Sequence, residues 1–598
     1  MKVLKHTSKI MLTLLTFAAC NVDPEYHSET SPGTFYDSPE RVYQRVGMVL
    51  SSWATDEGGG GIRSSFAMLQ EFTTDEICMP ARGSHWLDGG YYTQIMFHSF
   101  TPTLSGLNGA WNGIGTLVAN AWNVKEDLDT YVDFAATFPT DPNARAKILL
   151  QLDMVVASAY LRAIDFFGGY PIFRSNSDPV TAKATPQELF NFIDSLLTNA
   201  MDKLPARATV NTPVDGYATR GAAAAMKARL YFNAKAYTGT DKYGECAALC
   251  KEIIDGKYGP YELATDYRDI FGWGNETCTE IIWGAPSTNA LFELDPGNYP
   301  HSLHYNAGRT LRNLRRDAYN GHCLTPSLDG DGKSYMAGRP EISGRPDEKN
   351  PDAYMLGCPF AKFEDTDVRK QQYVYQGGGK YKGMFMMGYQ ENCLGILEYK
   401  DSIINLVDQI AYMSRQGKAD FKEGLIYGEE NSGIRLMKFS PIPAEEDISL
   451  WYNPDVPVIR LTEIYYTLAE CQLRGFGGNK SDAAANIKKV RDRYFVAGEN
   501  GSDGADPNPV TASNLDDEGY RMLDEWMIEF IGEKRRRTDL VRWGKFTTEK
   551  WFDHKDEKHG YDPGGKLNYR NKFPIPEAAL IANPLLEQNE GDWSGDQK

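Results

Sequence analysis

The sequence predicts a mainly α-helical protein, in which helix pairs of tetratricopeptide type form a scaffold and a large loop-rich insertion contains short strands. Three observations predict this architecture. Apolar residues recur at three- and four-residue spacing in paired stretches early and late in the chain. Thr185-Pro186-Gln187-Glu188 is a capping box with proline at the first helical position. Between residues 271 and 455, glycine and proline are frequent and apolar runs are short.

The N-terminal residues predict export and lipid attachment. Lysines precede an apolar stretch that is too short to span a bilayer, which is typical of a secretory signal. The stretch closes with Phe-Ala-Ala-Cys at Cys20, which resembles a lipobox. Residues 1–19 are therefore predicted to be a lipoprotein signal peptide, and Cys20 is predicted to be the lipidated first residue of the mature protein. An ordinary secretory cleavage with Cys20 incidental is the alternative. Residues 20–35 are polar, contain proline and glycine, and are predicted to be a flexible tether.

Residues 36–270 are predicted to form an N-terminal helical part. Leucine, valine and alanine at helical spacing predict a helix over 147–167, and the capping box starts the next one. The stretch 218–237 is rich in small residues that permit close helix packing. A partner helix is expected from Tyr243 after a short turn, with the thiols of its apolar stripe buried.

Residues 271–455 are predicted to be the loop-rich insertion and to carry part of the ligand face, because loops of this length are usually functional or covering. Residues 456–598 are predicted to form the C-terminal helical part with closing loops. Helices are expected there over 456–474 and 482–494 and around 523–537.

Composition excludes several classes of function. The net charge of −18 becomes −21 when the three lysines of the predicted leader are removed, and such an acidic surface repels nucleic acid. The nine cysteines show no zinc-site spacing, and Asp329-Gly-Asp-Gly lacks the later glutamate of a calcium loop, so neither a metal nor a cofactor is predicted. An exported protein can form disulfides, but the sequence does not indicate which cysteines would pair.

Six motifs stand in order along the chain. They are Phe-Phe-Gly-Gly-Tyr-Pro-Ile at 166–172, Ala-Thr-Arg-Gly-Ala-Ala at 218–223, Phe-Glu-Asp-Thr-Asp-Val-Arg at 363–369, Pro-Val-Ile-Arg-Leu-Thr-Glu at 457–463, Asp-Leu-Val-Arg-Trp-Gly at 539–544 and Pro-Ile-Pro at 574–576. Together with the lipobox, they resemble the SusD/RagB family of surface lipoproteins over nearly the whole chain. One departure is that Asp524-Glu525-Trp526 stands near the place of the family's Glu-Arg-Arg before Asp539.

The resemblance implies a role without catalysis. Family members are tetratricopeptide-type scaffolds at the outer membrane that cap a SusC-like TonB-dependent transporter and deliver oligosaccharides to it. The motifs themselves are interpreted as structural. Gly221 is expected to permit a close contact, and Arg542 is expected to pair with carboxylates.

The candidate binding residues come from two stretches. Glycan recognition needs aromatic faces and planar polar groups. Trp86 lies in a glycine-flanked polar loop with Asp88 and Tyr91, and this stretch resembles the family segment that leads into a Trp-bearing ligand loop. The alternative is a tryptophan that pins the loop to the scaffold or to the transporter.

The second stretch lies in the insertion, where rings alternate with hydrogen-bonding groups. Its candidates are Tyr299, His301, His304, Tyr305, Arg309, Arg312, Asn313, Asp317, Tyr319 and Asn320, and we single out Tyr299, Tyr305, Arg309 and Asn320 as ligand contacts. Trp273 is a further candidate. Trp283 is expected to be a core residue of a short strand.

The sequence favours glycan capture but leaves other functions open. A site for peptides on the same scaffold would use backbone-directed polar groups and apolar pockets. A glycoside hydrolase would need two paired carboxylates, which their number alone does not exclude. Neither His-Glu-x-x-His nor Gly-x-Ser-x-Gly accompanies them, so no enzyme is predicted. A lid without ligand affinity is the third alternative.

Overall fold

The computed structural model describes residues 32–58, 65–287, 299–305, 318–337 and 353–595, with gaps at 378–379, 393–394, 397, 400–401, 411–420, 423–424 and 441–453. The predicted leader and Cys20 lie outside these residues. The last residues of the predicted tether form a helical turn, α1 (Pro32–Phe35), and the Phe35 ring packs edge-on against Tyr36 at 5.0 Å. The last four residues of the predicted tether are therefore helical in the structure.

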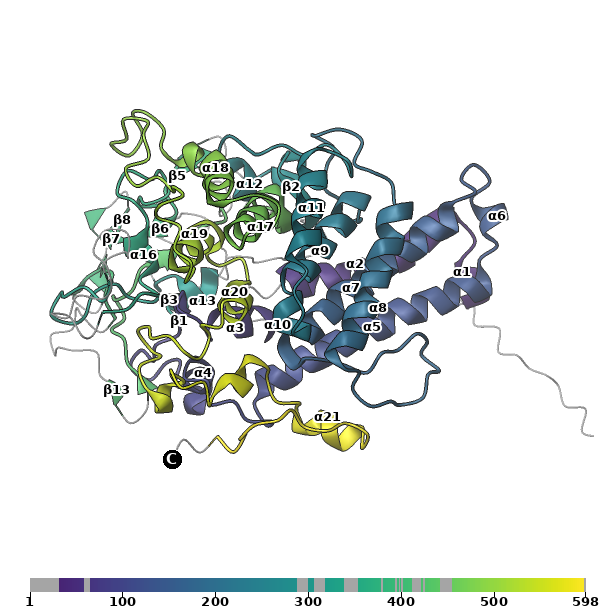
Figure 1. The fold of residues 1–598 in the computed structure, drawn as a ribbon, viewed down its shortest axis with the longest axis horizontal. Coiled ribbons are helices and arrows are strands. Elements are labelled where there is room, and N and C mark those ends of the chain that lie inside the picture. The colour runs from purple at the N-terminus through teal and green to yellow at the C-terminus, as the bar shows by residue number, and fades with distance from the viewer. Residues whose placement is uncertain are drawn as a thin grey trace, which may run out of the picture.

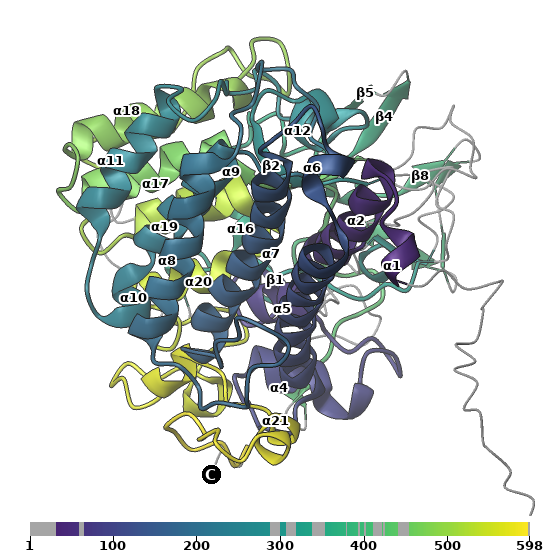
Figure 2. The same cartoon turned by 90° about the vertical axis from the view of Figure 1, so that its right-hand side faces the viewer.

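The long helices form one continuous stack (Figures 1 and 2). Neighbours in contact are α5 and α7, α7 and α8, α8 and α9, α9 and α11, α11 and α17, and α17 and α18. Helices α11 and α17 pack together although the whole insertion separates them in sequence, so the insertion interrupts the chain but not the stack. The bounds are α2 (Pro39–Gly58), α5 (Ser105–Tyr131), α7 (Ala144–Phe167), α8 (Pro186–Lys203), α9 (Arg220–Phe232), α10 (Ala234–Thr238), α11 (Tyr243–Ile254), α17 (Leu461–Leu473) and α18 (Lys480–Arg491).

Local sequence explains where these helices begin and end. In α8 the Thr185 hydroxyl accepts from the backbone N–H of Glu188, and the Glu188 carboxylate accepts from the backbone N–H of Thr185, which confirms the capping box. Helix α7 ends at Gly168, whose φ of 68° favours glycine. In α9 a side chain at Gly221 would collide with the Tyr261 ring, so the expected close contact is present.

The core contains the predicted apolar residues. Cys246 and Cys250 are fully buried. Trp283 is buried in strand β2 (Ile281–Ala285) and stacks on Trp53 at 4.1 Å between ring centroids. This contact joins α2, which carries Trp53, to β2, which carries Trp283. Trp283 is thus confirmed as a core residue.

Two predicted helices in the C-terminal part need correction. Residues Val456–Arg460 form strand β16, which pairs antiparallel with β2, and the helix begins only at Leu461. Proline and β-branched residues favour the extended chain there. The helix predicted around 523–537 is split into α19 (Tyr520–Phe530) and α20 (Arg536–Arg542) by a turn in which Gly532 has φ 74°.

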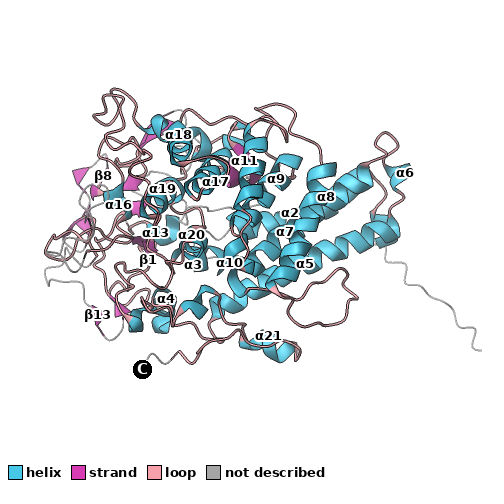
Figure 3. Ribbon diagram, in the orientation of Figure 1, coloured by secondary structure: helices cyan, strands magenta, loops and turns pink. Residues whose placement is uncertain are grey.

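The insertion contains short two-stranded pairs beside the helices, on the left in Figures 1 and 3; some are hairpins, and others join strands far apart in the chain, including β1 from the N-terminal part. These are the pairs β1 with β3, β4 with β5, β6 with β15, β7 with β12, β8 with β9, β10 with β11 and β13 with β14. Their bounds are β1 (Ile77–Cys78), β3 (Cys323–Leu324), β4 (Val374–Gly377), β5 (Lys380–Lys382), β6 (Phe385–Met386), β7 (Gly388–Tyr389), β8 (Glu391–Asn392), β9 (Gly395–Ile396), β10 (Glu398–Tyr399), β11 (Ser402–Ile403), β12 (Asn405–Leu406), β13 (Phe421–Lys422), β14 (Leu425–Ile426) and β15 (Arg435–Leu436).

Short helices complete the described chain. They are α3 (Ser65–Glu71), η2 (Asp88–Gly90), α4 (Tyr91–Met96), α6 (Phe134–Thr137), α12 (Arg268–Phe271), η3 (Asn275–Thr277), α13 (Tyr299–Ser302), α16 (Pro359–Lys362), η4 (Asp492–Tyr494), η5 (Glu557–His559), η6 (Asn568–Asn571) and α21 (Glu577–Ala582). Across the described ranges, we find no helix long and apolar enough to cross a membrane.

Buried ion pairs hold the C-terminal part to the rest. Arg542 contacts both Glu470 at 2.8 Å and Asp539 at 2.7 Å, as expected. Arg536 lies 2.7 Å from Asp75. The departure expected before Asp539 is wrong, because Glu533-Lys534-Arg535-Arg536-Arg537 stands one residue before it and supplies Arg536. Long-range pairing of this kind joins segments that no local pattern connects.

Acid should weaken the fold through these carboxylates. Burial opposes ionisation of Glu463, Glu470 and Glu529, but neighbouring arginines outweigh it and lower each pKa from 4.5 to about 2. Folding therefore gains stability from them above pH 4.5, and that stability is lost as the pH falls toward 2. Urea denaturation midpoints should fall progressively across this window. A midpoint that stays constant from pH 4.5 to about pH 2.5 would contradict the assignment.

Candidate ligand-binding site

Trp86 lies on a tight loop between β1 and η2, and its ring packs against His301 of α13. Strands β1 and β3 and helix α13 lie where the helices meet the insertion (Figure 1). Arg82 and His85 exchange backbone hydrogen bonds of 2.9 Å each, and Trp86 follows with φ 62°, in the left-handed region. The indole is partly buried and its Nε1 donates to the Tyr319 carbonyl at 3.0 Å. The ring is thus fixed in place and still reaches the surface.

Further rings surround Trp86. Tyr92 and His301 lie edge-on to it, with centroids 6.0 and 5.9 Å away. His301 in turn lies 5.2 Å from Tyr319, which is 45% exposed. Tyr91 packs edge-on against Tyr92 at 5.2 Å. We name Trp86, His301 and Tyr319 the aromatic face, because their rings are the ones that form a connected and partly exposed surface.

A close approach of the chain makes room for the indole. A Cβ at Gly321 would lie 2.9 Å from the Trp86 ring and would also meet the His301 carbonyl. Real Cβ atoms essentially never approach other atoms so closely. Glycine is therefore required at this position if Trp86 is to lie against the segment that carries Tyr319.

Two buried arginines support the aromatic face from below. Arg82 and Arg435 are both 0% exposed. Arg82 Nε donates to the Gly321 carbonyl at 3.1 Å, and Arg435 Nη1 donates to the same oxygen at 3.1 Å. Arg435 Nη2 also donates to Asn320 Oδ1 at 2.8 Å. The guanidinium groups thus fix the backbone that carries the face and do not themselves reach solvent.

The histidines beneath the face are uncharged at neutral pH. Burial, helped by the charges of Arg435 and Arg82, lowers the pKa of His304 to about 3. Burial and the charge of His301 lower the pKa of His322 well below its usual value. Within the residues that the structure describes, no group of three His, Cys, Asp or Glu side chains is arranged to hold a metal. The rings and polar groups of the aromatic face suit stacking and hydrogen bonding.

The structure brings several predicted site residues together. Trp86, Tyr91 and Tyr305 lie in one neighbourhood, with the Tyr305 ring 6.1 Å from His85. Asp88 is exposed on η2 beside them. Tyr299 begins α13, but its side chain is outside the described residues, as is all of Arg309.

Two predicted contacts are placed elsewhere. Asn320 is fully buried, and its amide nitrogen donates to the Glu430 carbonyl at 2.8 Å while its oxygen accepts from Arg435, so its side chain holds the loop and does not face solvent. Trp273 lines a separate polar hollow of about 740 Å³ with Arg268 and Asp269. Arg268 and Asp269 belong to α12, which lies toward the top of Figures 1 and 2, whereas α4, which follows the Trp86 loop in the chain, lies lower. Trp273 is therefore not part of the aromatic face.

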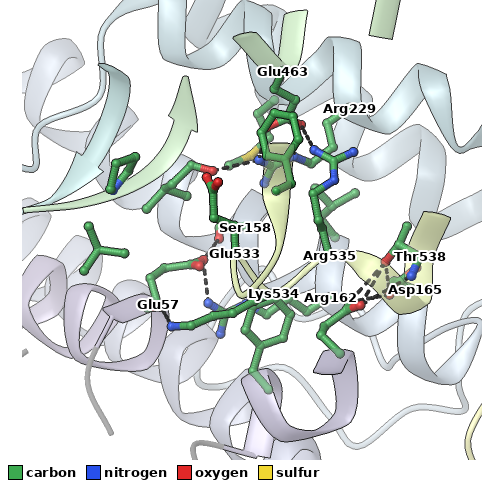
Figure 4. Close-up of a pocket in the computed structure, with 18 of the residues that line it drawn as sticks. Glu57, Ser158, Arg162, Asp165, Arg229, Glu463, Glu533, Lys534, Arg535 and Thr538 are labelled. Carbon is green, nitrogen blue, oxygen red and sulfur yellow. Dashed lines mark hydrogen bonds and ion pairs between the residues drawn. The ribbon is translucent and has the colours of Figure 1, made fainter. Parts of the chain in front are cut away.

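An interior cavity lies where the helices meet the turn before α20 (Figure 4). Its volume of about 110 Å³ is below the ~300–1,000 Å³ of typical small-molecule sites. Charged side chains that line the cavity contact other lining residues. Arg229 lies 2.7 Å from Glu463, and the Thr538 hydroxyl donates to Asp165 at 3.0 Å. We interpret this cavity as a structural feature, in which ion pairs and hydrogen bonds between lining residues connect helices of the scaffold.

Comparison with known proteins identifies the chain. The family model described as "SusD family" matches residues 279–592, more than half of the sequence. The chain belongs to the SusD family. Among its curated relatives, the starch-binding protein SusD of Bacteroides thetaiotaomicron is 25% identical over 545 residues, which cover 90% of this chain and 87% of that protein.

Solved structures extend the match over the N-terminal part of the SusD fold. A SusD superfamily protein from Parabacteroides distasonis has a TM-score of 0.61 at 15% identity and covers 92% of this chain and 99% of that chain. The surface glycan-binding protein A from Bacteroides thetaiotaomicron, solved in complex with laminarihexaose, has a TM-score of 0.58 at 16% identity and covers 92% and 99%. The predicted mainly helical scaffold and the predicted family are thus confirmed.

Sequence reasoning missed the residues that support the face in this SusD family member. Arg435 lies 115 positions from Asn320, so no local pattern connects them. The available signal was a single charged residue inside the run Gly433-Ile434-Arg435-Leu436-Met437, because a buried charge in an apolar strand needs specific partners. Gly321 carried no signal at all.

Proposed function

We propose that this protein is a non-catalytic lipoprotein of the outer-membrane surface that binds a glycan at the aromatic face and delivers it to a SusC-like TonB-dependent transporter. The observation that carries the proposal is the aromatic face itself. Rings with one exposed side suit the C–H surfaces of sugars, and the surrounding carbonyl and carboxylate groups suit hydroxyls. The names of the SusD-type relatives, which include a starch-binding protein and a laminarin-binding protein, support a glycan as the ligand.

Affinity electrophoresis or calorimetry on a panel of polysaccharides tests the binding step. The soluble chain from residue 21 onward should bind one glycan class and leave the others, and it should release no sugar from any of them. Retention of peptides alone would favour peptide capture. Release of sugar that a single carboxylate substitution abolishes would favour a hydrolase. A chain that binds neither glycans nor peptides would favour the alternative in which the protein is a lid of the transporter without ligand affinity.

The anchor is tested at Cys20. Cys20→Ala should move the protein from the membrane fraction to the soluble fraction, because the cysteine thiol would carry the lipid and no other acylation site is proposed. Cell fractionation with radioactive palmitate measures both location and labelling. A variant that stays in the membrane fraction with full lipid labelling would contradict the anchor assignment.

Delivery to a transporter is tested by co-purification. A SusC-like transporter should remain with the lipoprotein through detergent extraction, and Trp86→Ala should leave this complex intact. Loss of the complex in that variant would favour the alternative in which Trp86 contacts the transporter and not the glycan.

A further inference from the structure

Two thiols face one another beneath the aromatic face. Strands β1 and β3 are antiparallel, and Cys78 stands directly opposite Cys323. The two Sγ atoms are 3.9 Å apart, although 245 positions separate the residues in sequence. Both side chains are buried, with exposed fractions of 0% and 1%. Directly opposed positions of neighbouring strands fall within the Cα separations that disulfides span.

The two thiols differ in their electrostatic surroundings. Burial opposes ionisation of Cys323, but the hydrogen bond with Cys78 and the charges of Arg82 and Arg435 outweigh it and lower its pKa. Arg82 Nη2 lies 3.4 Å from Cys323 Sγ. Burial raises the pKa of Cys78. In the closed, reduced pair these charges therefore favour the anionic form of the Cys323 sulfur over that of the Cys78 sulfur.

Backbone carbonyls satisfy most of the N–H groups of Arg82 and Arg435 whatever the state of the sulfur. Over the described ranges, neither Arg82 nor Arg435 forms an ion pair with a carboxylate, and both donate to backbone carbonyls. A buried cation without an anion is costly. In the reduced, folded protein a Cys323 thiolate would be the anion nearest these two arginines, and in the oxidised protein their hydrogen bonds to backbone carbonyls remain.

We propose that Cys78 and Cys323 are joined by a disulfide in the exported protein. The Cys323 thiolate attacks the disulfide of a thiol oxidoreductase or of oxidised glutathione, forms a mixed disulfide and expels one thiolate of the oxidant. Cys78 then gives up its proton and attacks the Cys323 sulfur, and the second thiolate of the oxidant leaves. The two cysteines are oxidised, and the oxidant's disulfide is reduced to two thiols.

The link would tie together the two segments of the aromatic face. Cys78 lies four residues before Arg82 on the Trp86 segment, and Cys323 lies four residues after Tyr319. Because both sulfurs are buried, the exchange takes place before β1 and β3 close on one another. The proposal rests on the proposed surface location for its oxidant, but the state of the sulfurs is measured without any glycan, so the two proposals fail separately.

Mass spectrometry of the exported full chain tests the link. Cells producing the protein are quenched in acid, and free thiols are alkylated with N-ethylmaleimide in denaturant before digestion with trypsin. The peptide of Cys78 should appear joined to the peptide of Cys323 and should separate on reduction. Cys278 and Cys358 serve as controls, because they are buried and the residues described around them include no second thiol, so both should be alkylated.

Variants test the consequence for the fold. Adding reductant should lower the melting temperature of the wild-type protein by about 3 °C or more, because the link closes a long loop in the unfolded chain. The same reductant should leave the melting temperature of C78S/C323S unchanged. Full alkylation of both cysteines in the exported protein would overturn the proposal, even if refolding with oxidised glutathione in vitro joined them. A link from either cysteine to a third one would overturn it equally.

Discussion

Trp86→Ala is expected to weaken glycan binding by about 30-fold, the equivalent of the ~2 kcal/mol typical for a central tryptophan in an interface. The indole is the middle of the aromatic face, with His301 and Tyr92 edge-on to it and Tyr319 beyond. Its loss removes the largest stacking surface and the hydrogen bond to the Tyr319 carbonyl. Calorimetry with the glycan that the panel identifies measures the change.

Two further variants separate stacking from loop positioning. Trp86→Phe keeps a ring but loses the Nε1 donor, so it should retain most of the affinity if stacking dominates. Tyr319→Ala removes an exposed ring without touching the indole and should weaken binding by about tenfold. Tyr131→Ala is the matched control, because this tyrosine is 43% exposed at the far end of α5. Equal binding by wild type and Trp86→Ala, with both folded, would contradict the proposed site.

Arg460→Met is expected to destabilise the fold by about 3–5 kcal/mol, the usual cost of removing one partner of a buried ion pair. Arg460 is 1% exposed and lies within 3.0 Å of Glu280, Glu529 and Glu533. Its loss leaves these buried carboxylates with fewer cations, although Arg493 still contacts two of them. Methionine can fill the space beside the Phe530 ring but loses the cation–π contact of the guanidinium, whose Cζ lies 4.1 Å from the ring centroid, so the change reports mainly on charge.

Chemical denaturation measures this loss, with Arg145→Met as the matched control. Arg145 lies 2.6 Å from Asp129, but both side chains are about half exposed, at 54% and 48%. The control should change the free energy of unfolding by less than about 0.5 kcal/mol, because water and salt screen surface pairs. Similar losses in the two variants would show that burial does not strengthen the network around Arg460.

Local sequence patterns predicted some residues of the candidate site and could not predict others. Trp86 was placed on a loop because its glycine-rich surroundings have no helical period, and Tyr305 because rings alternate with polar groups in its stretch. Both predictions lie at one surface in the structure. The same alternation also predicted Asn320, which is buried, because a one-dimensional pattern does not distinguish a group that faces solvent from one that pairs with Arg435. Trp273 was predicted on residue type alone and lies elsewhere.

The sequence by itself determined the scaffold of this protein. Helical period, a capping box and the six motifs are local properties, and they predicted α7, α8, α9 and α18 and the family, because neighbours within a few residues decide helix formation. Only the tertiary structure decided that α11 packs on α17 across the insertion, that Arg460 meets three carboxylates, and that Cys78 faces Cys323. These contacts join positions far apart in the chain, and their energy comes from burial and charge neutralisation, which exist only once the chain is folded.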